Sequence, residues 1–180
     1  GDKAVKTWDR WIAGLAAGLI ATGLVPLSEV ARSHTRLEVL RDGNIVDLAL
    51  VDALVYDSVF IASRAVWEMD RVRTVFLNRA ESEKIGISSI GGMIHPVGPE
   101  EPKGLCLELG ENGRRVIAPI APGMIREVLV SAQSVMRIGE EFKIRLTPSV
   151  LALDGEREVE IRQGQEAAIR LGEPGPSVVD

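Results

Sequence analysis

The 180-residue sequence contains a single cysteine, Cys106, and only two histidines, His34 and His95. One cysteine cannot form an internal disulfide, so we expect a protein of a reducing compartment, the cytoplasm. A lone cysteine and two separated histidines without an HExxH motif argue against zinc, and we predict no metal-binding residues. No basic segment followed by an apolar core opens the sequence, so no secretion signal is visible.

Positive charge is also scarce, because 21 Lys and Arg stand against 26 Asp and Glu and give a formal net charge of −5. A protein that binds the phosphate backbone of nucleic acid needs a basic face, so we expect no nucleic-acid partner. Nucleotides remain possible ligands, since a few backbone N–H groups can hold one or two phosphates.

Segment 11–27 contains no charged residue, and within it Gly14 and Gly18 stand four positions apart. Its length is at the lower edge of the roughly 17–25 residues that span a bilayer, and Gly-x-x-x-Gly occurs in membrane helix dimers. Pro26 and the many weakly apolar Gly and Ala positions instead favour a buried helix, onto which a sheet or second helix packs closely. A membrane segment is the less favoured alternative.

From Arg36 onward the apolar pattern has a period of two, which is typical of strands. Strands are predicted at 37–39, 45–56, 72–77, 105–109, 116–120, 142–146, 150–153, 159–161 and 169–171. Turns are predicted at 41–44, 111–114, 154–155 and 163–164, and a short helix at 61–70 with Ser63 as a possible N-cap. The predicted fold class is α+β and mainly β, an N-terminal helix and connecting loop (1–35) followed by an antiparallel β-sandwich-like domain (36–180).

Segment 86–96 is the densest candidate site, because Ser88 and Ser89 are followed by Gly91 and Gly92. Two hydroxyls and paired glycines permit a nest of N–H groups suited to phosphate or ribose oxygens, although an ordinary turn is the commoner outcome. The two prolines of segment 118–123 predict a rigid loop that stops strand pairing, and segment 152–156 predicts a hairpin turn.

Asp47, Asp52 and Asp57 lie on or beside the predicted strand 45–56, where strict alternation places Asp52 on the opposite face from the other two. An unpaired carboxylate is costly to bury within so apolar a strand, which makes Asp52 a candidate functional carboxylate. The sequence has no Ser-His-Asp signature and no recognisable spacing of paired glycosidase acids, and we predict no catalytic residue.

Six segments taken in order are more specific than any one of them: AGLAAGLIATG, LALVDALVYDSVFIASRAVW, IGISSIGGMIHPV, APIAPG, LALDGEREVEI and GPSVVD. From residue 11 to 180 they closely resemble the C-terminal part of the acetoin catabolism protein X (AcoX) family, of the ATP-NAD kinase-like group. The resemblance implies the fold of the NAD kinase C-terminal domain, phosphoryl transfer to a ribose hydroxyl of NAD, and a homo-oligomer. It also implies a preceding α/β half with a Gly-Gly-Asp-Gly-Thr motif for ATP and Mg, so we expect this chain to be inactive alone.

By position, 50–52 matches the segment where NAD kinases hold an Asn-Glu or Asn-Asp pair against the dinucleotide, with Val51 in place of the asparagine. Segment 88–92 matches a Thr/Ser-rich, Gly-Gly-containing loop that embraces the dinucleotide, without the usual tyrosine. The resemblance thus implies that NAD or NADP is bound by Asp52, Ser88, Ser89, Gly91 and Gly92. If the lost asparagine and tyrosine have relaxed NAD recognition, the alternative is a non-catalytic ligand-binding or oligomerisation module.

Overall fold

The computed structural model describes residues 9–57 and 69–179. Within these residues the helices are α1 (Arg10–Ala21), α2 (Leu27–Val30), the 3-10 turn η1 (Met69–Arg71) and α3 (Ser88–Gly92). The strands are β1 (Ala31–Ser33), β2 (Arg36–Arg41), β3 (Asn44–Ala49), β4 (Asp52–Tyr56), β5 (Val72–Leu77), β6 (Lys103–Ala121), β7 (Met124–Arg137), β8 (Glu141–Lys143), β9 (Ser149–Leu153), β10 (Arg157–Ile161), β11 (Ala167–Gly172) and β12 (Ser177–Val179).

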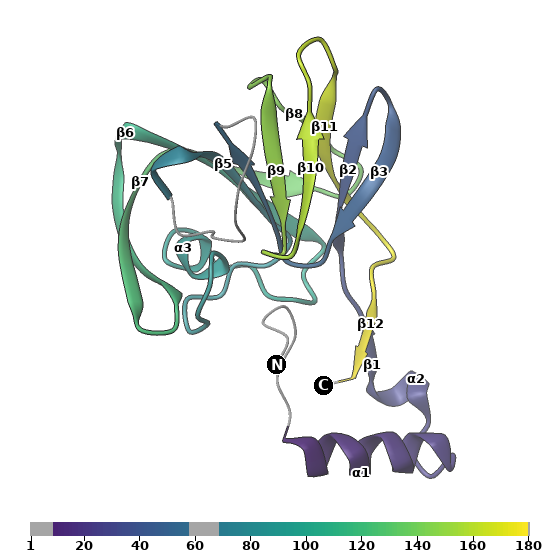
Figure 1. Cartoon of the computed structure of the whole chain (residues 1–180). Helices are drawn as coiled ribbons and strands as arrows, with labels where there is room; N and C mark the ends of the chain where they lie inside the picture. The colour runs from purple at the N-terminus through teal and green to yellow at the C-terminus, as the bar shows by residue number, and fades with distance from the viewer. Residues whose placement is uncertain (1–8, 58–68, 180) are drawn as a thin grey trace.

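Two antiparallel sheets form the body of the molecule (Figure 1). The larger sheet has the order β10-β9-β4-β5-β6-β7, and the smaller one β3-β2-β11-β8. Apolar side chains from both sheets share one core, in which Val39 and Ile169 of the smaller sheet join Val55 and Phe76 of the larger sheet. This arrangement confirms the predicted mainly β, sandwich-like fold.

A second core covers the opposite face of the larger sheet. It contains Leu54 and Leu77 from the sheet, Ile90 from α3, and Val116 from the far part of β6. The long β6–β7 hairpin curls around this side of the sheet, with α3 beside it (Figure 1). Leu54 belongs to this core and Ala53 to the other, so strand alternation directs the Asp52 side chain toward the face that carries α3.

The predicted strand 45–56 is wrong in one respect, because the chain forms two strands there, β3 and β4, in different sheets. Leu50 and Val51 separate them, and the backbone amides of both residues bond to the Asp154 side chain instead of to a neighbouring strand. Asp47 and Asp52 therefore belong to different sheets, and alternation along one strand does not relate them.

The turn predicted at 111–114 is also wrong, since β6 runs through it as an irregularity of its pairing with β7. Leu109 and Arg114 both pair with Val130, which shows that the residues between them loop out of the ladder. Pro119 does not stop strand pairing as predicted, because it pairs with Ile125 inside the hairpin. The strand β7 is not among the predicted strands, and the predicted strand 142–146 shortens to β8.

The predicted strands 37–39, 72–77, 150–153, 159–161 and 169–171 are confirmed. Most of the predicted helix 61–70 lies outside the described residues. The predicted N-terminal helix exists as α1, with the Asp9 side chain accepting a hydrogen bond from the Trp11 amide at 2.9 Å.

The prediction that this N-terminal helix is buried is wrong. No residue of α1 is buried, and Trp11 is 74% exposed and Leu15 65%. Among the residues that the structure describes, nothing lies within 4 Å of the position a Cβ would take at Gly14 or Gly18. The helix lies apart from the two large sheets, beyond the β1–β12 pair (Figure 1). No helix in the described part of the chain is long and apolar enough to cross a membrane.

Candidate functional site

One carboxylate, that of Asp154, binds the backbone at the break between β3 and β4. Asp154 accepts hydrogen bonds from the backbone amides of Leu50 at 2.9 Å, Val51 at 2.8 Å and Asp52 at 3.2 Å. Asp154 sits at the β9–β10 turn with a φ of 53°, followed by Gly155 with a φ of 70°, the left-handed pair that tight hairpins favour. The hairpin turn predicted at 154–155 is confirmed, and it points a carboxylate at three successive amides.

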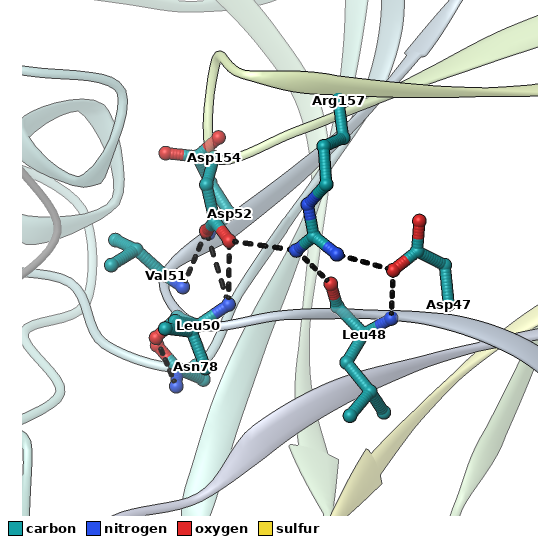
Figure 2. A network of polar contacts seen from close by, with 8 residues as sticks. All are labelled: Asp47, Leu48, Leu50, Val51, Asp52, Asn78, Asp154 and Arg157. Carbon is teal, nitrogen blue, oxygen red and sulfur yellow. Dashed lines mark hydrogen bonds and ion pairs between the residues drawn. The ribbon is translucent and has the colours of Figure 1, made fainter. Parts of the chain in front are cut away.

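Arg157 connects this carboxylate to a second one. Its guanidinium lies 3.7 Å from Asp154, donates to the Leu48 carbonyl at 2.6 Å and pairs with Asp47 (Figure 2). Asp47 in turn accepts from the Leu48 amide at 2.7 Å. The charge of Asp154 is thus partly balanced from the solvent side by a half-exposed arginine.

Asp52 differs from its two acidic neighbours because its carboxylate has no hydrogen bond or ion pair within the described residues. The residue keeps partial contact with solvent, while protein atoms densely surround the carboxylate. Burial and, to a smaller extent, the Asp154 charge raise the pKa of Asp52 from 3.8 to about 7, against an opposing effect of Arg79. Asp52 therefore exchanges a proton near neutral pH and has acceptor oxygens free for a ligand.

Asn78 and Arg79, which the sequence analysis did not single out, complete the surroundings of Asp52. Asn78 donates from its side-chain amide to the Leu50 carbonyl at 2.7 Å and to the Thr35 carbonyl at 2.8 Å, and its backbone amide donates to the Val51 carbonyl at 3.1 Å. Arg79 is largely buried and lies 3.8 Å from Glu81. A polar pair directly after the apolar strand 72–77 was the sequence signal for both.

The four predicted residues of segment 88–92 all lie in α3 and all are buried. The Ser89 hydroxyl donates to the Gly86 carbonyl at 2.7 Å. A Cβ at Gly91 would lie 2.5 Å from Cδ1 of Leu77, and one at Gly92 would lie 2.2 Å from the Ser82 nitrogen. The structure thus gives the glycines a packing role, and the ligand-binding role of Ser88, Ser89, Gly91 and Gly92 stays a prediction.

Asp52 and α3 are brought together by the end of β5. Leu77 pairs with Asp52 in the sheet, and the same leucine contacts the Gly91 position of α3. The site therefore consists of one free carboxylate, a cation at Arg79, and an exposed loop over 82–85 that leads into α3. A carboxylate of this kind can accept hydrogen bonds from hydroxyl groups, while a nearby cation favours an anionic ligand.

Comparison with known proteins shows which family the chain resembles. The family model described as Acetoin catabolism protein X C-terminal domain matches residues 35–174. The chain is also similar to Acetoin catabolism protein X of Cupriavidus necator, with 41% identity over 167 residues that cover 89% of this chain and 46% of that relative. The chain spans about half the length of the curated relative that it matches.

Proposed function

The chain belongs to the acetoin catabolism protein X family, and on that premise we propose that it serves acetoin catabolism as the dinucleotide-binding half of an ATP-NAD kinase-like phosphotransferase. Its ligand is NAD or NADP, and this dinucleotide is the acceptor of the phosphate. ATP and Mg enter only with an α/β half that precedes this domain, and the chain alone transfers no phosphate. The proposed location is the cytoplasm.

The free carboxylate of Asp52 is the observation that carries this proposal. Ribose hydroxyls are donors, and an acidic side chain that accepts from them is a common way to bind a dinucleotide. Asp154 cannot take this role as it stands, because its oxygens already accept from three backbone amides. Asp52 has no such partner among the described residues, and the positive charge of Arg79 acts on it.

The exposed apolar side chains of α1 support a partner for this domain, namely the half of the family protein that precedes it. The residues of α1 lie outside the matched domain 35–174, and Trp11, Ile12 and Leu15 are each more than half exposed. The similarity to the curated relative covers 89% of this chain, whereas the domain model matches only residues 35–174. The six residues after 174 are too few to account for the difference, so the similarity includes residues before 35. We propose that α1 packs against the preceding half of the family protein, in the same polypeptide or in a separate one.

Calorimetric titration of this chain with NAD, NADP and ATP tests the proposal. Saturable binding of NAD or NADP, with ATP bound only after the preceding half is restored, is the expected result. Phosphoryl transfer from ATP to NAD should likewise require both halves. If neither the chain nor the two halves together bind a dinucleotide, the proposal is wrong. Substitution of Gly91 cannot decide the question, because an added side chain meets Leu77 and disturbs packing.

A homo-oligomerisation module is the second candidate, and the β7 edge favours it. β7 is the last strand of the larger sheet, and Ile117 and Ile125 of the β6–β7 hairpin are 58% and 65% exposed. An unpaired strand edge with exposed apolar side chains readily pairs with another copy. Light scattering should show that Ile125→Lys reduces the oligomer mass, whereas Ile45→Lys on β3 leaves it unchanged. Self-association without any nucleotide binding would favour this function over the first.

A further inference from the structure

Asp154 forms hydrogen bonds with both the backbone amide and the backbone carbonyl of Asp52. Its own amide donates to the Asp52 carbonyl at 3.0 Å, while its carboxylate accepts from the Asp52 amide at 3.2 Å. The same carboxylate accepts from Val51 and Leu50, so three successive peptide groups are fixed where the chain passes from one sheet to the other. The direction in which Asp52 leaves β4 therefore depends on Asp154.

The charges around Asp52 come from several elements. Asp154 of the β9–β10 turn is a negative neighbour whose side chain is only 9% exposed, so water screens its charge weakly. Arg79, after β5, is the positive neighbour. Arg157 of β10 lies 3.7 Å from Asp154 and is itself shared with Asp47 of β3. Among these groups Asp154 is the one that contacts the Asp52 backbone directly.

We propose that Asp154 is a positioning residue of the ligand site, which fixes the backbone of Asp52 and holds a negative charge close to it. The assignment of Asp52 to a ligand site rests on the proposed function. The effect of Asp154 on Asp52 is a property of the ligand-free chain and can be measured without any ligand.

Carboxyl ¹³C NMR of the full chain over a range of pH tests this inference, with the Asp52 signal assigned from its loss in Asp52→Asn. Asp154→Asn removes the negative neighbour, and the titration midpoint of Asp52 should move to lower pH. Asp57→Asn is the matched control, because it removes a carboxylate that follows the other end of β4 and pairs with Arg73, without touching Arg157 or the three amides. The titration midpoint of Asp52 in this control variant should stay at the wild-type value. An unchanged Asp52 midpoint in a folded Asp154→Asn chain would overturn the inference.

Arg157→Gln gives an independent test if Asp154→Asn does not fold. This substitution leaves the amide contacts of Asp154 in place and removes the cation 3.7 Å from its carboxylate. Asp154 then acts on Asp52 without compensation, and the Asp52 midpoint should move to higher pH. No movement in Arg157→Gln would contradict the proposed control by charge.

Calorimetry with NAD separates the two proposals. If NAD binds, the pH at which affinity changes should move in Asp154→Asn in the same direction as the Asp52 midpoint. If NAD binds to no variant, the proposed function fails, while the NMR midpoints still decide whether Asp154 controls Asp52.

Discussion

Replacement of Asp52 by asparagine tests whether this carboxyl is held in a surrounding that disfavours its charge. The amide has the shape of the protonated carboxyl and never ionises. At low pH, where Asp52 in the folded protein keeps its proton, wild type and Asp52→Asn should be about equally stable. At higher pH the wild type alone carries an unpartnered charge within the described structure.

The magnitude follows from the difference between folded and unfolded protein. Asp52 releases its proton at a pKa of about 7 when folded, against an ordinary value of 3.8. Between these values the folded chain binds more protons than the unfolded chain, so its free energy of unfolding falls as pH rises. Each unit corresponds to about 1.4 kcal/mol, and the wild type should lose about 4 kcal/mol relative to Asp52→Asn between pH 4 and pH 8.

Urea unfolding of both proteins at a series of pH values measures this difference directly, and other titrating groups cancel in the comparison. Asp57→Asn is the control, because Asp57 is half exposed and pairs with Arg73 at the surface. Its difference from wild type should stay within about 1 kcal/mol at every pH. A difference between Asp52→Asn and wild type that does not grow with pH would refute the reasoning.

Three further substitutions or treatments test the packing and charges away from Asp52. Gly92→Ala should lower the free energy of unfolding by about 2–3 kcal/mol in urea titrations, because a Cβ would lie 2.2 Å from a backbone nitrogen, whereas Gly14→Ala should not destabilise the chain. Glu38→Gln should cost about 3 kcal/mol at pH 7. Burial raises the pKa of Glu38, but hydrogen bonds and charges from Arg36 and Arg170 outweigh it and lower the pKa below its ordinary value of 4.5. This loss should therefore shrink as pH falls below 4.5 and vanish once Glu38 is protonated in the folded chain. Cys106 should react with a thiol reagent at pH 8 only after unfolding, because burial raises its pKa to about 12, and rapid labelling of the native chain would contradict its placement.

The strand pattern could be predicted from the sequence wherever one face of a strand is apolar. Alternation at 37–39, 72–77 and 169–171 placed β2, β5 and β11 correctly, since each strand turns its apolar face to a core. The β7 strand was missed because many of its side chains are exposed and do not alternate clearly. The break at Leu50 and Val51 was hidden because both residues continue an apolar run, and the carboxylate that bonds their amides comes from more than a hundred positions away.

The candidate site could be predicted only in part. Asp52 stood out because a carboxylate in an apolar run must lie in an unusual surrounding, and the structure gives it one. The paired glycines of segment 88–92 predicted an open nest, but they lie in a short buried helix. Glycine is needed at both positions because the neighbouring chain leaves no room for a Cβ. Asp154 was identified as a turn residue, whereas its contact with Asp52 depends on how two sheets meet and leaves no local pattern.

Titration calorimetry of NAD with wild type, Asp52→Ala and Asp57→Ala tests most directly whether Asp52 binds the dinucleotide. A hydrogen bond to a charged group contributes about 1.5–3 kcal/mol, so loss of the Asp52 carboxylate should weaken NAD binding at least about tenfold. Asp57→Ala removes a carboxylate from the other end of β4 and should bind NAD as tightly as wild type. Equal affinity of Asp52→Ala and wild type would contradict the Asp52-centred site.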